Sequence, residues 1–169
     1  MQLKKLSSVI AVVILVPLIL WAVAGAVTAF HDGPLGVVPG GPFSSGKTSP
    51  YPLNWNFLAG RNTLQFQTVE PPVARTIAFV VVDGRLFLTS NMQGINSWYK
   101  RWPYQAVSNS EILLRVDGQV YEARLFRIEQ GLEIEPVLHA FESKYNDSMG
   151  IGAAEITEGY TWMFEVVDH

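Results

Sequence analysis

The residues with the most recognisable chemical pattern lie between Gly41 and Thr48. This stretch, GPFSSGKT, matches the phosphate-binding sequence G-x-x-x-x-G-K-[ST] in full. Such a loop holds phosphate only between a buried strand and a helix whose N-terminus faces the anion. Here Pro50 and Pro52 obstruct a following helix, and no strand pattern precedes Gly41. We therefore interpret the match as a chance product of a segment rich in Gly, Pro and Ser.

Other residue types that carry chemistry are sparse or scattered. The chain has no cysteine, which excludes disulfides, thiolate metal sites and a cysteine nucleophile. Its 3 histidines, His31, His139 and His169, show no metal-ligand spacing. Neither G-x-S-x-G nor H-E-x-x-H occurs. Glu133 and Glu135 fit the first turn of a helix, where the helix dipole favours acidic residues. We predict no metal site, and the sequence alone names no reaction.

A cluster of aromatic and basic residues lies near the middle of the chain, in the sequence WYKRW. On a helix, Trp98 and Trp102 would share one face. Rings placed in this way can stack on a flat ligand or pack against a partner, but core packing is their more common use.

Two β-hairpins flank this cluster and are expected to position it. Apolar runs are interrupted at Asp83-Gly84 and again at Asp117-Gly118. An Asp-Gly pair between β-rich runs favours a type I′ turn, which needs positive φ at both central residues. The two pairs therefore predict two tight antiparallel hairpins.

Periodicity predicts the remaining elements. Strict alternation of apolar and polar residues indicates half-buried strands, and an apolar stripe at helical spacing indicates a helix. We predict a mainly β (α+β) domain, a small antiparallel barrel with two short helices. The predicted strands are 64–69, 76–82, 85–89, 111–116, 119–128 and 160–167, and the predicted helices are 96–107, interrupted near Pro103, and 133–145.

An uncharged apolar segment of 25 residues, Leu6 to Phe30, precedes this domain. About 20 apolar residues suffice to span a bilayer as a helix. The basic start and the Ala22-Val23-Ala24 site also fit a cleaved signal peptide, although the apolar centre of such peptides is usually shorter. We expect a retained transmembrane anchor, with Lys4 and Lys5 in the cytoplasm and the domain outside, in the periplasm or its equivalent.

Composition divides the chain into three parts. Residues 1–32 form the anchor, 33–53 form a linker rich in Gly, Pro and Ser, and 54–169 form the β domain. Of the 12 basic residues, 10 lie beyond Lys5, where they face all 15 acidic residues. An acidic domain of this kind is a poor nucleic-acid binder, so we expect no nucleic-acid partner.

The order of motifs from about Trp55 to Tyr145 resembles the FMN-binding split-barrel proteins. This family includes pyridoxamine-phosphate oxidases and deazaflavin-dependent nitroreductases. The shared parts are an R-x-[VI] strand opening, a D-G turn, a strand ending in T-S, a segment with basic residues, an N-x pair and a long hairpin. In this sequence they are Arg75-Thr76-Ile77, Asp83-Gly84, Thr89-Ser90-Asn91, Lys100-Arg101, Asn109-Ser110 and 112–128.

The resemblance implies a flavin nucleotide, FMN or a relative, and a set of residues to hold it. An Arg fork, hydroxyl groups and a second cation would bind the phosphate, a donor set that suits a dianion. The resemblance implies Arg75, Thr89, Ser90 and Lys100 or Arg101 in these roles, with Trp98 or Tyr99 against the flavin ring. Catalytic residues are not identified.

Two functions from different classes follow. The first is a membrane-anchored split-barrel oxidoreductase that binds a flavin. The alternative is a split barrel without cofactor, which docks on a membrane protein complex as an accessory subunit. The family pattern is incomplete in this chain, because Ser110 stands where the family usually has proline. Expected partners are the lipid bilayer, through residues 6–30, and either a membrane protein complex or a second copy of the chain.

Overall fold

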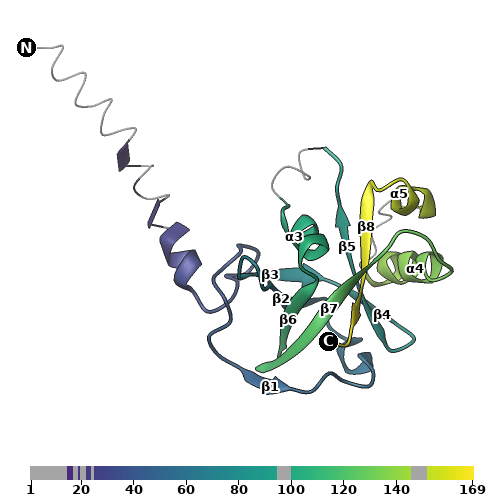
Figure 1. The fold of residues 1–169 in the computed structure, drawn as a ribbon, viewed down its shortest axis with the longest axis horizontal. Coiled ribbons are helices and arrows are strands. Elements are labelled where there is room, and N and C mark those ends of the chain that lie inside the picture. The colour runs from purple at the N-terminus through teal and green to yellow at the C-terminus, as the bar shows by residue number, and fades with distance from the viewer. Residues whose placement is uncertain (1–14, 17–18, 20–21, 24, 95–99, 146–151) are drawn as a thin grey trace, which may run out of the picture.

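A curved antiparallel sheet organises the protein (Figure 1). The computed structural model describes residues 15–169 except 17–18, 20–21, 24, 95–99 and 146–151. Seven strands follow the order β3-β2-β6-β7-β8-β5-β4, and β1 pairs with β7 in parallel. The elements are β1 (Lys47–Ser49), the 3₁₀ turn η1 (Asn56–Leu58), β2 (Thr63–Thr68), β3 (Val73–Ala78), β4 (Val80–Val82), β5 (Arg85–Asn91), α3 (Trp102–Ser108), β6 (Glu111–Val116), β7 (Gln119–Ile128), α4 (Ile134–Tyr145), α5 (Ala153–Thr157) and β8 (Thr161–Val167). The mainly β fold predicted from periodicity is confirmed.

Both predicted hairpins form at the Asp-Gly pairs. Asp83 and Gly84 have φ angles of 51° and 78°, and Asp117 and Gly118 have φ angles of 50° and 74°. These positive angles are those of a type I′ turn, whose twist matches that of the flanking strands. Local turn chemistry therefore sets the register of β4 on β5 and of β6 on β7.

The sheet curves back on itself through a bend at Phe79. The two outermost strands of the order, β3 and β4, are consecutive in the chain and are separated only by this residue. Phe79 N–H donates to the Tyr145 hydroxyl at 3.0 Å, and its carbonyl accepts from Lys144 Nζ at 2.9 Å. Helix α4 thus satisfies the backbone groups that the bend removes from the ladder. The sequence predicted one strand over 76–82, and the structure divides it here.

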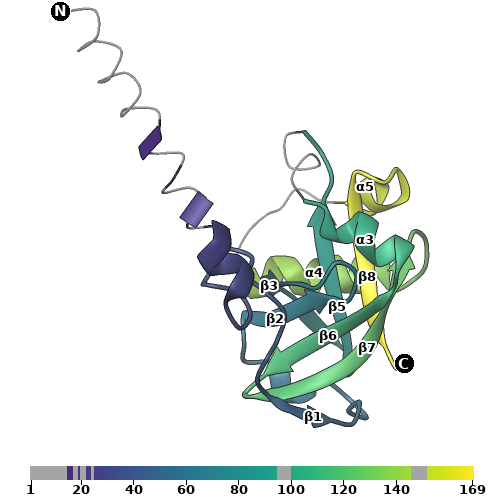
Figure 2. The ribbon, with the colours of Figure 1, turned by 60° about the vertical axis from the view of Figure 1, so that its left-hand side comes forward.

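Two hydrophobic cores lie on opposite faces of the β5–β8 part of the sheet. The inner core joins the barrel strands to α3, and the second core joins the sheet to α4 and α5 (Figures 1 and 2). We call the corresponding sides of the sheet the inner face and the α4 face. Along β5, Leu86 and Leu88 lie on the inner face, and Phe87 lies on the α4 face. This alternation follows from the two-residue period of a strand.

The helices differ in part from the prediction. The apolar stripe of α4 is buried as predicted. Helix α3 begins only at Trp102, because Pro103 suits the first helical turn but not a helix interior. Lys100 and Arg101 therefore precede α3 and do not lie on it, which corrects the prediction for these two residues. Residues 96–99, the first four of the predicted helix, lie outside the described residues. The short helix α5 was not predicted.

The segment predicted as a linker, 33–53, packs along the sheet. Its backbone forms a reciprocal bridge between Gly40 and Ala74 of β3, and residues 47–49 become strand β1. Phe43 N–H donates to the Gln67 side chain at 2.5 Å. Apart from a turn at 35–38 and strand β1, the segment is irregular, and parts of it lie against the sheet.

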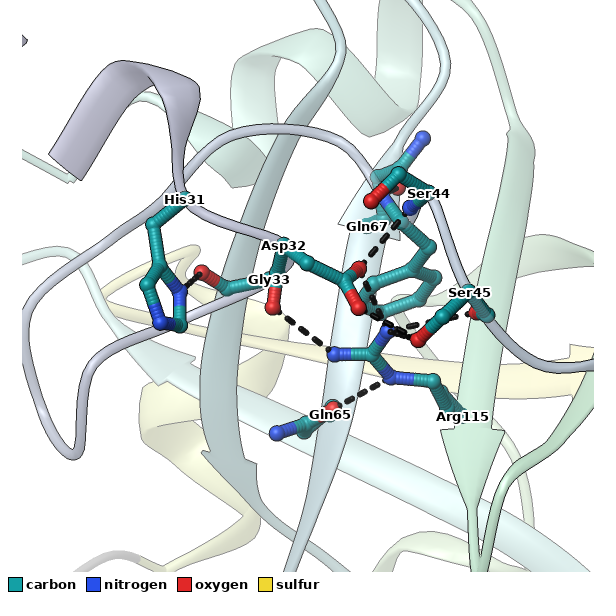
Figure 3. Close-up of polar contacts among 9 residues, drawn as sticks. His31, Asp32, Gly33, Ser44, Ser45, Gln65, Gln67 and Arg115 are labelled. Atoms are coloured by element: carbon teal, nitrogen blue, oxygen red, sulfur yellow. Dashed lines mark hydrogen bonds and ion pairs between the residues drawn. The ribbon is translucent and has the colours of Figure 1, made fainter. Parts of the chain in front are cut away.

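An ion pair joins the start of this segment to the sheet (Figure 3). Arg115 Nη1 lies 2.6 Å from Asp32 Oδ1, and the Arg115 side chain is only 11% exposed. The guanidinium also donates to Gln65 at 2.6 Å and lies 4.2 Å from the centre of the Phe43 ring. A hydrogen bond from the Ser45 hydroxyl holds the pKa of Asp32 well below its usual range. We call Asp32, Ser45 and Arg115 the clasp.

Most of the predicted anchor, 6–30, lies outside the described residues. Residues 25–30 are helical, and the apolar side chains Val27 and Phe30 are exposed. Within the described ranges, the structure contains no helix that is both long enough and apolar enough to cross a membrane.

Candidate functional site

The two hydroxyl residues predicted to bind phosphate point to opposite faces of β5. Ser90 pairs with Trp162 of β8, which packs against the inner core, whereas Thr89 pairs with Met163 of the second core. Since adjacent strand residues alternate between faces, only one of the two can face the barrel interior. The structure places Ser90 on the inner face and Thr89 on the α4 face.

Arg75 lies on the inner face of β3, the first strand in the sheet order. It pairs with Phe66, a fully buried residue of the inner core, and its guanidinium carbon lies 5.8 Å from the centre of that ring. Its Nη1 atom is buried and finds no hydrogen-bond partner among the described residues. Burial lowers the pKa of Arg75 to about 10, so the side chain remains charged at neutral pH.

Ser90 carries a second buried polar atom without a partner. The residue is 4% exposed, and its Oγ makes no hydrogen bond within the described part of the chain. Strands β3 and β5 are not paired, but they contact each other, and Arg75 and Ser90 both lie on the inner face. Buried polar groups normally have partners, and exceptions of this kind call for an explanation.

Helix α3 covers this region with aromatic side chains. Trp102 contacts Phe66 and Phe164, each with ring centres 5.3 Å apart. Tyr104 contacts Trp162 at 5.0 Å. Trp162 and Phe164 are also in contact, with ring centres 6.3 Å apart, so the rings connect Phe66, beside Arg75, with Trp162, which pairs with Ser90. We call this set of five rings the aromatic row.

Two polar residues missed by the sequence analysis also adjoin the aromatic row. Arg127 lies 3.8 Å above the centre of the Trp162 ring and pairs with Glu129 at 3.1 Å. Its Nε and the Oε1 of Gln105 are buried without a hydrogen-bond partner in the described residues. Arg127 continues the inner-face alternation of Ala123 and Leu125, so a charged residue in an apolar phase was the signal that could have revealed it.

The other predicted site residues are less closely placed. Lys100 is half-buried, and burial lowers its pKa. Arg101 is exposed and occupies the N-cap position of α3. Trp98 and Tyr99 lie outside the described residues, so their predicted contact with a flavin ring stays a prediction.

The phosphate-loop pattern is not a site. Residues 47–49 form β1, which pairs with β7, so no helix N-terminus follows Gly46-Lys47-Thr48. This confirms that the pattern lacks the structural context that phosphate binding requires.

The chemistry available near α3 is that of an anion site. Arg75 Nη1 and Arg127 Nε are unpaired donors, Ser90 Oγ can donate or accept, and Gln105 Oε1 accepts. Charged donors in a buried setting bind anionic oxygens more strongly than neutral donors do. In the described ranges, no group of three or more His, Asp or Glu side chains is arranged to hold a metal ion.

Comparison with known proteins gave structural matches alone. No family model and no curated protein matches the sequence. Similar solved structures include a FAD-binding protein from Mesorhizobium loti, with a TM-score of 0.45, 15% identity, and coverage of 68% of this chain and 86% of that chain. They also include the heme storage protein HutZ from Vibrio cholerae, with a TM-score of 0.47, 11% identity, and coverage of 68% and 86%. A proposed pyridoxamine 5′-phosphate oxidase from Listeria innocua has a TM-score of 0.46, 13% identity, and coverage of 66% and 87%.

Proposed function

We propose that this protein is a membrane-anchored split barrel that binds a flavin nucleotide of the FMN type and acts as an oxidoreductase. The observation that carries the proposal is the pair of unpartnered buried polar groups, Arg75 Nη1 and Ser90 Oγ, on the inner face of β3 and β5, two strands that contact each other. A ligand phosphate would satisfy both groups.

The residues near α3 fit the phosphate end of such a nucleotide. A phosphate oxygen accepts well from a guanidinium and from a hydroxyl, and both are present without competing carboxylates in hydrogen-bonding contact with them. Arg75 would bind and orient the phosphate, Ser90 would donate to it, and Lys100 would add a second positive charge. The proposal assigns no such role to Thr89, because it faces α4. Once bound, the flavin would supply transfer of one or two electrons.

The membrane location is part of the same proposal. It is supported by the uncharged run from Leu6 to Phe30 and by Lys4 and Lys5 before it, which favour a cytoplasmic N-terminus and a barrel outside the cytoplasm. The lipid bilayer is therefore the first expected partner.

The test is flavin binding by the full chain, purified in detergent. We expect FMN to bind and its fluorescence to be quenched, and we expect Arg75→Ala to weaken binding by roughly 10- to 100-fold, because a hydrogen bond to a charged group is worth about 1.5–3 kcal/mol. Arg61→Ala is the matched control, since Arg61 is a surface arginine paired with Asp117. This control should bind FMN as the wild type does.

Either of two results would contradict the flavin proposal. In the first, the wild-type chain shows no flavin absorption bands and does not quench the fluorescence of added FMN. In the second, Arg61→Ala weakens FMN binding as much as Arg75→Ala does. The accessory role on a membrane complex would then be the function to test next, by crosslinking the full chain in its native membrane.

A further inference from the structure

A tight turn with an apolar tip follows the N-terminal helical residues. Leu35 and Val38 exchange two backbone hydrogen bonds, each of 3.0 Å, and Gly36 has a φ of +60°. Val37, at the tip, is 91% exposed. Turns in water favour Gly, Pro, Asn, Asp and Ser, so Leu-Gly-Val-Val is an unusual composition for an exposed tip.

Phe30 extends this apolar surface toward the N-terminus. It is the last residue of the helical stretch 25–30 and is also 91% exposed. Figures 1 and 2 show the N-terminal helical residues leaving the barrel on the side of β2 and β3. Exposed aromatic and aliphatic side chains next to an uncharged apolar segment are typical of a surface that meets the membrane interface.

The turn is held on the barrel and cannot readily bury its own tip. The Thr76 hydroxyl of β3 donates to the Gly36 carbonyl at 2.6 Å, and Gly40 and Ala74 exchange backbone hydrogen bonds of 2.8 Å and 3.1 Å. On the N-terminal side, the clasp pairs Asp32 with the nearly buried Arg115 (Figure 3). Both ends of the turn are thus attached to the sheet.

The electrostatics of the segment favour lipid as the partner. No charged residue occurs from Gly33 through Gly46. The one charge immediately before it, Asp32, is neutralised by Arg115. The N–H and carbonyl groups of Leu35 and Val38 and the carbonyl of Gly36 already have hydrogen-bond partners, which lowers the cost of entering a medium poor in water. A protein partner would more often be matched by charges around an apolar centre.

We propose that the 35–38 turn forms a second membrane contact, which inserts into the interfacial layer of the bilayer beside Phe30, the last residue of the anchor. This proposal rests on the proposed membrane location. The clasp and the bonds to β3 then fix the orientation of the barrel, with the β2–β3 side toward the lipid.

The absence of cysteine from the chain allows a site-specific test. Val37→Cys is labelled with an environment-sensitive nitrobenzoxadiazole group, and the full chain is reconstituted into phosphatidylcholine vesicles. The matched control is Leu132→Cys, a 95% exposed apolar position in the segment between β7 and α4. Figure 1 shows α4 on the opposite side of the barrel from the N-terminal helical residues. Spin-labelled lipids then report which label contacts the bilayer.

We expect the label at residue 37 to emit at shorter wavelength and to lose most of its emission to spin-labelled lipid, and the label at residue 132 to behave as in water. Flotation of the same samples tests the anchor separately. A chain that floats with the vesicles while the label at residue 37 remains in water overturns the inserted turn alone. A chain that does not float overturns the membrane location as well. Shielding of residue 37 in native membranes but not in pure lipid would identify a protein as the occupant, and would also overturn the lipid contact.

Discussion

At the scale of single residues, the site near α3 combines groups that cost stability with groups that could bind a ligand. A buried donor without a partner has lost its hydration and gained nothing, at a cost of about 1–3 kcal/mol. Arg75 and Ser90 both carry such atoms. Natural proteins retain groups of this kind where binding requires them, because stability above a threshold is not selected further.

This cost leads to a prediction about the ligand-free protein. Arg75→Met keeps a long side chain beside Phe66 and removes the buried charge, so we expect the free energy of unfolding to rise by about 1 kcal/mol. Ser90→Ala should change stability in the same direction by a smaller amount. Chemical denaturation of the full chain without flavin measures both effects.

The same two variants should bind FMN more weakly than the wild type. Thr89→Val is the control, because it replaces a neighbouring hydroxyl that faces α4 and should leave FMN binding unchanged. Lower stability of Arg75→Met without ligand would show that Arg75 supports the fold, and its role in a binding site would then be in doubt.

At the scale of elements, the two Asp-Gly hairpins use the same backbone geometry in different surroundings. A Cβ added at Gly118 meets no atom within 4 Å, whereas one added at Gly84 lies 2.9 Å from the Cβ of Asn54. Trp55 N–H also donates to the Gly84 carbonyl at 2.8 Å, which holds this segment close to the turn.

Alanine substitutions should therefore separate backbone strain from steric conflict. Gly118→Ala is expected to destabilise by about 1 kcal/mol, the cost of a left-handed conformation for a residue with a Cβ. Gly84→Ala should cost more, because Asn54 must also move. Thermal unfolding followed by circular dichroism measures the difference.

Asparagine provides the control for the first variant. Gly118→Asn should cost less than Gly118→Ala, since asparagine tolerates the left-handed region better than alanine does. Equal stability of Gly84→Ala and Gly118→Ala would contradict the proposed role of Asn54.

At the scale of the whole molecule, the clasp determines how the N-terminal segment meets the barrel. Breaking a hydrogen-bonded ion pair around a nearly buried arginine leaves that charge poorly compensated. We expect Asp32→Asn to lower the free energy of unfolding at neutral pH by about 1–3 kcal/mol. The exposed pair of Arg61 and Asp117 is the control, and Asp117→Asn should change stability by about 0–1 kcal/mol.

The contribution of Asp32 should also depend on pH in a defined direction. The hydroxyl of Ser45, together with Ser44 N–H and Arg115, holds the pKa of the folded carboxyl below its unfolded value, which is about 3.9. A group with a depressed folded pKa stabilises the protein above its unfolded pKa, and this effect is lost as the pH falls toward the folded pKa. The stability difference between wild type and Asp32→Asn should thus be constant from neutral pH to about pH 5 and shrink in stronger acid. A constant difference through that acid range would contradict the low pKa.

The sequence by itself determined the features whose causes lie in neighbouring residues. Asp83-Gly84 and Asp117-Gly118 specify their turns through local φ preferences, and both turns form as predicted. The apolar stripe of α4 likewise predicts its buried face, and the alternation in β8 places Trp162, Phe164 and Val166 on one face, since periodicity links sequence directly to orientation. The burial of Met163 on the opposite face of β8 follows from its packing in the second core.

Only the tertiary structure decided which distant segments meet. The bend at Phe79 depends on Tyr145, 66 residues away, and the clasp joins Asp32 to Arg115 across 83 residues. Alternation alone shows that Thr89 and Ser90 face opposite sides, but the pairing with β8 and the packing of α3 and α4 decide which of them faces the inner core. The same closure of the sheet brings Arg75 to that face. Local preferences act over a few residues, whereas the choice among distant partners follows from burying one shared core.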